Sequence, residues 1–325
     1  MRLFDLRTQS DSERVTLSTL QQTPPASGAA SLDALIDAAL PPFPLKVQLQ
    51  TQTRCNAACS MCPYDDVARA PGFEHEQMSE GLFLKIIDEL SAHPVERLSP
   101  FLMNEPLLDK RMERWLATAR RALPGTTLNL FTNGSALDAK RAVRLAEAGL
   151  DELCVSVHGF DAVAYGSVMV GLSFERTLSA LRGVVAAHVA GDLGALDLRI
   201  VTGDAPETGV TPPPDWLEPY VLRKGFSNER AVNTHVAALD PTDTLETRPL
   251  CQRPFVKLYV MADGECVMCN CDWRRRVVLG QLRVHSIAEV WRGEAYRILR
   301  RRHVQRAFDR GHPCFGCDYP AVVEP

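Results

Sequence analysis

The chain has 325 residues, 46% of them hydrophobic, and a formal net charge of −4. This length and apolar content suffice for one large core, or for a main domain with a small second one. The charge balance excludes a general attraction to nucleic acid or to anionic membranes, and we interpret the arginine runs at 274–276 and 300–302 as solvated surface.

The N-terminal segment argues against export. It is charged from Arg2 onward and has no apolar stretch of the signal-peptide type. No segment of the chain reaches the roughly 18 apolar residues of a membrane span. We therefore expect a cytoplasmic protein without a membrane partner. In that reducing compartment, ten cysteines in clusters favour metal ligation over disulfides.

Residues 1–44 are rich in Ser, Thr, Ala and Pro, and we expect an extension outside the core with one short helix over 31–40. From residue 45, apolar strand-like runs alternate with amphipathic helical patterns, which predicts a parallel sheet of right-handed crossover units. The expected strands are 45–51, 95–102, 126–132, 152–157 and 196–202. The expected helices are 78–92, 109–122, 138–148 and 173–190.

The pattern changes after Trp216, through a proline-rich stretch, into a different module that starts near Leu250. Residues 255–268 predict a β-hairpin with its turn at Asp263 and Gly264. A helix is expected from about Ser286 to Ala307, ended by the glycine and proline at 311 and 313.

The first cysteine group has the spacing C-x3-C-x2-C and follows the first predicted strand directly, at Cys55, Cys59 and Cys62. Three thiolates on one loop can hold an iron-sulfur cluster, but they leave one of four irons open to a small molecule. The alternative is a zinc knuckle with a fourth ligand elsewhere. The position after a strand of a parallel sheet favours the ligand-binding cluster, because such sheets bind ligands at the carboxyl ends of their strands.

Three further segments follow successive strands, and with the cysteines they resemble the radical SAM superfamily. Residues 103–106, Met-Asn-Glu-Pro, look like the family's Gly-Gly-Glu-Pro segment, with Asn104 in place of a glycine. Residues 132–134 resemble its Thr-Asn-Gly segment. Residues 156–159 resemble its Ser-x-Asp-Gly segment, with histidine in place of aspartate. Each tripeptide alone would be a turn signal, whereas their order after successive strands is specific.

The resemblance implies a fold, a cofactor set and roles for site residues. The expected fold is an α/β partial (β/α)6 barrel over residues 45–235. Cys55, Cys59 and Cys62 would hold a [4Fe-4S] cluster that binds and cleaves S-adenosylmethionine (SAM). Glu105 would contact the amino group of SAM. Further SAM contacts are expected from Asn133, Ser156 and His158.

The second cysteine group comprises Cys251, Cys269, Cys314 and Cys317. Four ligands allow a closed cluster suited to electron transfer or structure, and the spacing resembles the accessory module called SPASM in its full form and twitch in its short form. No further cysteines follow Cys317, so we expect the twitch form over residues 250–325 with one auxiliary [4Fe-4S] cluster. A four-cysteine zinc site is the alternative.

Two more cysteines leave the ligand assignment open. Cys266 and Cys271 lie within reach of Cys269 in the hairpin segment, and we expect all three on one face. Either neighbour could replace Cys269 as a ligand. Both are also candidate hydrogen donors on an accessory loop facing the barrel mouth. We interpret Cys154, which should point into the barrel, as a small buried core thiol.

The reaction type stays open between two outcomes. Oxidation results if a base removes a proton and the auxiliary cluster takes an electron, whereas epimerisation results if a cysteine thiol returns hydrogen to the opposite face. Arg230, with Asn233 and His235 nearby, could bind a carboxylate or hydroxyl or assist deprotonation, and the alternative for this stretch is a solvated loop.

The substrate class follows from resemblance alone. Twitch relatives act on sugars and aminocyclitols, so we expect a small polar metabolite of sugar, aminocyclitol or nucleoside type in a biosynthetic pathway. An external reductant such as flavodoxin or ferredoxin is the expected partner. The second hypothesis is a peptide or protein maturase, although residues 1–44 are too short for a leader-binding domain. A non-enzymatic iron-sulfur or zinc protein would leave Glu105 and the strand-end segments unexplained.

Overall fold

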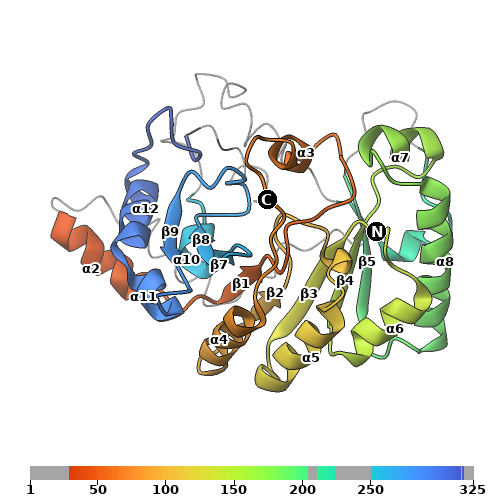
Figure 1. Ribbon diagram of the computed structural model, residues 1–325, viewed down its shortest axis with the longest axis horizontal. Coiled ribbons are helices and arrows are strands. Elements are labelled where there is room, and N and C mark those ends of the chain that lie inside the picture. Colours follow the sequence, from red (N-terminus) through yellow and green to blue (C-terminus); the bar gives the residue numbers. More distant parts are fainter. Residues whose placement is uncertain (1–28, 204–210, 224–249, 316, 318–325) are drawn as a thin grey trace.

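The computed structural model describes residues 29–203, 211–223, 250–315 and 317. One nine-stranded sheet runs through the molecule in the order β6-β5-β4-β3-β2-β1-β7-β8-β9 (Figure 1). Its strands are β1 Lys46–Leu49, β2 Arg97–Ser99, β3 Thr127–Thr132, β4 Glu152–Ser156, β5 Asp197–Thr202, β6 Val221–Arg223, β7 Lys257–Val260, β8 Glu265–Val267 and β9 Val278–Gln281.

The helices of the barrel part follow the predicted alternation. They are α3 Tyr64–Ala68, α4 Glu80–Ser91, η1 Pro106–Leu108, α5 Met112–Ala122, α6 Ala139–Glu147, α7 Ala162–Val168, α8 Phe174–Ala190 and η2 Glu218–Tyr220. Ser79, Asp138 and Ser173 cap α4, α6 and α8 by accepting a backbone N–H at each N-terminus. The strands β1 to β6 pair in parallel throughout. The predicted α/β class and partial (β/α)6 barrel are therefore confirmed.

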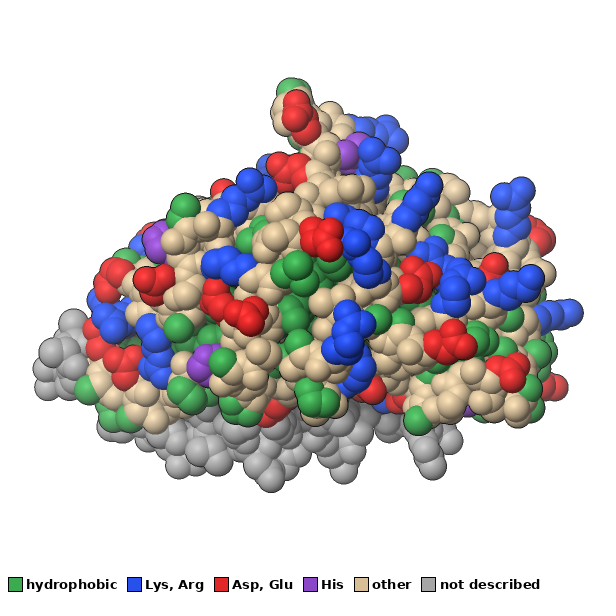
Figure 2. Space-filling model, turned by 60° about the horizontal axis from the view of Figure 1, so that its bottom comes forward, with side chains coloured by type: hydrophobic (Ala, Val, Ile, Leu, Met, Phe, Trp, Pro, Cys, Tyr) green, Lys and Arg blue, Asp and Glu red, His purple; other side chains and the backbone are tan. Residues whose placement is uncertain are grey.

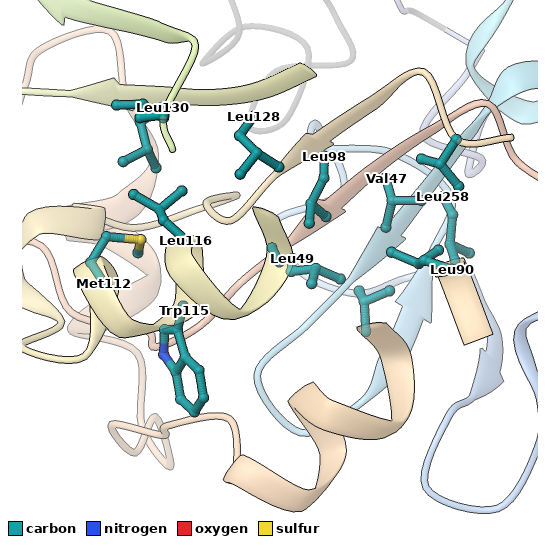
Figure 3. Close-up of a cluster of buried hydrophobic side chains, with 14 of the residues drawn as sticks. Val47, Leu49, Leu90, Leu98, Met112, Trp115, Leu116, Leu128, Leu130 and Leu258 are labelled. Atoms are coloured by element: carbon teal, nitrogen blue, oxygen red, sulfur yellow. The ribbon is translucent and has the colours of Figure 1, made fainter. Parts of the chain in front are cut away.

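The core lies between the strands and the helices that cover their outer face. Figure 3 shows Val47, Leu98 and Leu128 pointing from the sheet toward the helical layer, where Trp115 and Leu116 of α5 lie. All five side chains are nearly inaccessible to solvent. Because alternate residues of a strand point to opposite faces, Gln48, Ser99 and Asn129 face the inner side of the barrel.

The C-terminal module continues the barrel sheet. Strand β7 pairs in parallel with β1, and β8 and β9 then follow as antiparallel neighbours. The predicted turn at Asp263 and Gly264 joins β7 to β8, with the Gly264 N–H donating to Met261 O. The shared sheet fixes the module against the first barrel strand.

Two expectations about the ends of the chain are wrong in part. The expected helix over 286–307 is two helices, α11 Ile287–Arg292 and α12 Glu294–Gln305, because Gly293 between them has extended backbone. Helix α12 ends at Gln305, close to the expected end at Ala307, because Arg306 is in the left-handed region. A short helix α10, Arg253–Val256, precedes β7.

The expected N-terminal helix exists as α2, Ala29–Ala39, but it is not outside the core. Its Leu32 and Ile36 are buried with the main core, and Asp33 pairs with Arg301 of α12 at 2.6 Å. Figure 1 shows α2 beside α12. This part of the N-terminal segment therefore packs on the C-terminal module.

The surface seen from below the strands carries both signs of charge. Figure 2 shows Lys and Arg side chains interspersed with Asp and Glu across this face, in keeping with the small net charge. Among the described helices, none combines the length and the apolar character that crossing a bilayer requires.

Candidate active site

The first cysteine loop is fastened to its surroundings by backbone hydrogen bonds. The Cys55 N–H donates to the phenol oxygen of Tyr64 at 2.8 Å, and the Cys62 N–H donates to Cys59 O at 2.9 Å. Two further N–H groups, of Ala58 and Ser60, donate to carbonyls just after α7 and at its end. The three thiols are therefore presented by a loop whose backbone is held from both sides.

Glu105 lies at the centre of the strand ends and is only 2% exposed. Its Oε1 accepts the Thr132 hydroxyl at 2.6 Å and the Leu107 N–H at 2.9 Å, and its Oε2 accepts the Asn133 N–H at 2.6 Å. The carboxylate thus joins the end of β2 to the end of β3. Burial raises the pKa of Glu105, against the lowering effect of these hydrogen bonds.

Asn133 connects the carboxylate to the cysteine loop. Its side-chain amide donates to Asn56 Oδ1 at 3.0 Å and points to Cys55 Sγ at 4.0 Å. Its backbone N–H holds Glu105 at the same time. Three of the predicted site residues, Cys55, Glu105 and Asn133, therefore form one connected group.

Gly134 and Gly159 end the third and fourth strand segments in conformations that side chains disfavour. Gly134 has φ of 75°, and a Cβ there would meet Val155 at 2.9 Å. Gly159 has φ of 117°, and a Cβ there would lie 2.5 Å from the Tyr165 backbone nitrogen. The glycines of both motifs are thus needed for close backbone approach at the strand ends.

Ser156 and His158 lie at the next strand end, that of β4. The Gly203 N–H donates to His158 Nδ1 at 3.2 Å, so this nitrogen carries no proton. Burial lowers the pKa of His158 to about 4. A neutral imidazole therefore replaces the family's aspartate, with Nε2 carrying the proton.

Two observations test whether these residues fit a SAM-binding cluster. Glu105 is buried, and Arg141, the cation that lowers its pKa, is paired with Glu113 at 3.0 Å, so the carboxylate can still accept an incoming ammonium group. Burial raises the pKa of Cys59 to about 12, and the nearby Cys55 adds to this. Thiolates in such a place need metal charge to be stable. The residues present therefore fit a SAM-binding [4Fe-4S] cluster.

A zinc site and an iron-sulfur cluster make different demands on the thiols. One zinc ion requires its ligands to converge on a single point, whereas each cysteine of a [4Fe-4S] cluster binds a different iron.

The second cysteine group gathers around α10, the end of β8 and the segment after α12. Burial raises the pKa of Cys251, and the neighbouring Arg253 opposes this rise. Cys314 lies 3.8 Å from the sulfur of Met268 and 3.7 Å from His303 Nε2, and the Cys317 N–H donates to Cys314 O at 3.5 Å.

Cys271 and Cys266 differ in their surroundings. The Arg253 guanidinium donates to Cys271 Sγ at 3.0 Å, and the Cys271 N–H donates to Cys269 Sγ at 3.4 Å, so Cys271 belongs to the second group. Cys266 is fully buried in the main core on β8, and burial raises its pKa far above the ordinary value. The expectation that Cys266 sits on a loop facing the barrel mouth is therefore wrong.

Cys154 is 1% exposed and packs with Val201 and Leu222, apart from the main core that contains Leu153 and Val155. This arrangement agrees with a buried thiol on the inner side of β4. The stretch with Arg230, Asn233 and His235 lies outside the described residues.

Three features of the site escaped sequence reasoning. Tyr64 holds Cys55, Gln52 Nε2 donates to Glu105 O at 2.8 Å, and Arg253 lies between two cysteines. The one available signal was sequence proximity, since Tyr64 and Gln52 flank the cysteine motif and Arg253 follows Cys251 by two residues.

The fold and the strand-end group together define a parallel barrel with a cluster-binding loop, and comparison with known proteins identifies the family. Residues 49–192 match the radical SAM superfamily, and residues 251–318 match the iron-sulfur cluster-binding SPASM domain. The chain therefore carries a radical SAM domain followed by a C-terminal module of SPASM/twitch type. Its cofactors are a SAM-binding [4Fe-4S] cluster, an auxiliary cluster and SAM.

Curated relatives match part of the chain. The GTP 3′,8-cyclase of Mycobacterium ulcerans is 34% identical over 158 residues, which are 48% of this chain and 41% of that protein. The S-adenosyl-L-methionine-dependent 2-deoxy-scyllo-inosamine dehydrogenase of Niallia circulans is 26% identical over 113 residues, 34% of this chain and 44% of that protein. The chain thus spans less than half the length of these relatives.

Solved structures share the fold over longer stretches. BtrN in complex with AdoMet and 2-DOIA superimposes with a TM-score of 0.60 at 18% identity, covering 86% of this chain and 95% of that one. Streptococcus suis SuiB bound to the precursor peptide SuiA gives a TM-score of 0.54 at 12% identity, covering 93% and 77%. At these identities the likeness concerns the fold.

Proposed function

We propose that the protein is a radical SAM enzyme that oxidises a small polar metabolite. The observation that carries this proposal is the connected group at the strand ends, in which buried Glu105 lies beside the loop of Cys55, Cys59 and Cys62. When bound, the reduced cluster and SAM supply a 5′-deoxyadenosyl radical, which takes a hydrogen atom from a C–H bond of the substrate.

The residues of this chain have separate tasks in the proposal. Cys55, Cys59 and Cys62 hold the cluster. Glu105 accepts the ammonium group of SAM, which gives the buried carboxylate a direct cationic partner. Asn133 keeps Glu105 and the cysteine loop in one geometry.

The inner side of the barrel supports a polar substrate. Asn129 Nδ2 donates to Glu152 Oε2 at 3.1 Å, and the Ser99 hydroxyl donates to Asn129 Oδ1 at 3.3 Å. The Arg97 guanidinium donates two further hydrogen bonds to the Glu152 carboxylate, at 2.5 and 3.0 Å. A row of polar groups across β2, β3 and β4 favours hydroxyl and amino groups over an apolar ligand.

Oxidation is favoured over epimerisation by the position of one thiol. A hydrogen-donating cysteine must reach the substrate, and Cys266 is enclosed in the core. Cys271 is the remaining candidate, and it is engaged by Arg253. Loss of a proton and of one electron to the auxiliary cluster, held by Cys251, Cys269, Cys314 and Cys317, completes a two-electron oxidation of an alcohol or amine to its carbonyl level.

A GTP 3′,8-cyclase activity is the second candidate, because the most similar curated relatives carry that name. Their match covers 41–46% of their length. The similarity therefore supports SAM cleavage more than the choice of GTP. A peptide maturase is supported by fold likeness only.

The decisive experiment is anaerobic reconstitution, reduction with dithionite and detection of 5′-deoxyadenosine. Absence of this product from cluster-loaded protein contradicts the proposal. Running the reaction in deuterated water distinguishes the two outcomes, since an epimerase thiol would introduce solvent deuterium on carbon. The auxiliary cluster is tested with the triple variant C55A/C59A/C62A. Retention of about four irons by this variant would support the auxiliary cluster. Zinc in place of these irons would overturn it.

A further inference from the structure

Arg300 of α12 is a cation in the interior of the C-terminal module. Only 1% of this residue is exposed. Its guanidinium donates to Pro254 O at 2.8 Å through Nε and to Trp291 O at 2.7 Å through Nη1. It also lies over the rings of Trp291 and Tyr296, at 4.2 and 4.5 Å from their centroids. Neutral carbonyls and aromatic faces therefore surround a full positive charge.

The guanidinium of Arg300 still needs a negative counter-charge. Its Nη2 is buried and has no hydrogen-bond partner in the described part of the chain. Asp37, the carboxylate whose charge favours the Arg300 cation, is paired with Arg292 at 3.6 Å. Burial lowers the pKa of Arg300 to about 9, so the side chain keeps its charge at neutral pH. A buried charge is strongly unfavourable unless an opposite charge compensates it.

Arg300 lies between two segments that carry expected ligands of the auxiliary cluster. Pro254, whose carbonyl accepts from Arg300, follows Cys251 by three residues. His303 is one turn further along α12, on the same face, and its Nε2 lies 3.7 Å from Cys314 Sγ. Both Arg300 and His303 are buried. The positive charge is thus about one helical turn from a residue that contacts an expected ligand.

The interior of the module carries an excess of positive charge. Among its described residues, Arg253 and Arg300 are buried, against one buried carboxylate, that of Asp272. Asp272 accepts the backbone N–H groups of Arg276 and Val277 at 2.9 and 2.8 Å, so its charge is directed at its own turn. A [4Fe-4S] cluster held by four thiolates is an anion, and its net charge helps to set its potential. Such an anion would compensate the buried cations.

We propose that Arg300 is a buried counter-charge of the auxiliary cluster and raises the midpoint potential of that cluster. Arg300 binds no iron. It is a positioning residue that acts through its charge and through its hold on Pro254. The consequence for the reaction rests on the proposed function, because a cluster that is easier to reduce accepts the electron of the substrate more readily. The alternative is that Trp291 and Tyr296 stabilise the cation alone.

The test is an anaerobic redox titration of the cluster-loaded full chain, followed by EPR. R300M removes the charge and keeps an apolar side chain of similar length. It should make reduction of the auxiliary cluster about tenfold less favourable, which lowers the midpoint potential by about 59 mV for one electron. R300K keeps the charge but loses the planar group of donors, so reduction should change less than about threefold.

R297M is the matched control, because Arg297 is an exposed arginine on the same helix. Water screens its charge, so reduction of the auxiliary cluster should change less than about twofold. An unchanged midpoint potential in R300M overturns the proposal and leaves Arg300 as a packing residue. Equal shifts in R300M and R300K, or in R300M and R297M, also overturn it.

Iron content and melting temperature cover the case in which R300M does not load the auxiliary cluster. A second neutral variant, R300Q, then takes its place, and its potential decides if it loads. Loading of R300K but of neither neutral variant supports the role of the charge. Failure of all three variants shows that Arg300 is needed for packing alone and overturns the proposal.

Formation of 5′-deoxyadenosine separates this proposal from the proposed function. The redox titration contains neither SAM nor substrate and reports on the clusters alone. A shifted potential in R300M, with no 5′-deoxyadenosine from the reduced wild type, contradicts the proposed function only. Formation of 5′-deoxyadenosine by the wild type, with an unchanged potential in R300M, contradicts only the role of Arg300.

Discussion

The first cysteine group lies on one loop, residues 55–62, whereas the second is spread over residues 251–317. In the first group, the proposed ligands are near neighbours in the sequence, and Glu105 lies in the segment after another strand, β2. In the second group, α10, the end of β8 and the chain after α12 must all meet. The first group therefore depends on local backbone geometry, and the second on the packing of the whole module.

The charges near the two groups also differ. Burial is the main cause of the raised pKa at both Cys55 and Cys251. At Cys55 the nearby Glu105 adds to the rise, whereas at Cys251 the neighbouring Arg253 opposes it. A buried anion disfavours added negative charge, and a buried cation favours it.

Gly159→Ala should have the largest effect on the barrel end. The added Cβ would meet backbone atoms at 2.5 and 2.6 Å, in a conformation with φ of 117°, and we expect a loss of about 3 kcal/mol in the free energy of unfolding. Gly166→Ala in α7 is the control, because no atom lies within 4 Å and helix propensity should rise. Equal melting temperatures for the two variants would refute the assignment of strain to Gly159.

Glu105→Gln should reduce 5′-deoxyadenosine formation about 100-fold. The amide is neutral and no longer accepts an ammonium group as an ion pair, although it preserves the shape of the side chain. E147Q, which replaces an exposed carboxylate at the end of α6, is the matched control. The result would be inconsistent with our assignment if SAM affinity and cleavage were both retained while the cluster content stayed normal.

The pH dependence of stability should report His158. Its pKa is lowered from its ordinary value of 6.5 to about 4, so the unfolded chain takes up a proton before the folded one does as the pH falls. The contribution of neutral His158 to the free energy of unfolding is fully present above pH 6.5. This contribution should decrease by about 2 kcal/mol between pH 7 and pH 5.

Thermal unfolding of the wild type and of H158Q at both pH values measures this difference. The wild type should lose more stability than H158Q over the interval. H75Q, at an exposed histidine, should behave like the wild type. Parallel pH profiles of the wild type and H158Q would show that His158 does not titrate as expected.

Arg253→Gln should have the smallest effect and should act on the module alone. Removing the guanidinium beside Cys271 should lower the midpoint potential of the auxiliary cluster by about 60 mV, a tenfold change for one electron. Redox titration followed by EPR separates the two clusters. If the midpoint potential of the SAM-binding cluster shifted instead, or if both potentials shifted equally, the electrostatic contrast between the two groups would be refuted.

Sequence patterns predicted most of the barrel because the signals were local. The alternation of strands and helices predicted β1 to β5 and their covering helices, and the segments at residues 103–106, 132–134 and 156–159 lie at the expected strand ends. Helix α2 was expected outside the core because its partner α12 is distant in the sequence. The break at Gly293 was missed because helical periodicity continues across it.

The sequence by itself predicted the radical SAM and SPASM/twitch domains and their cofactors, and it predicted which loop holds the first cluster, because ligand spacing within one loop is a local property. The tertiary structure decided what long-range contacts control. It joined β7 to β1, enclosed Cys266 in the core and brought Arg253 to Cys271. Packing fixes such neighbours only when the whole chain is folded, and no local pattern contains them.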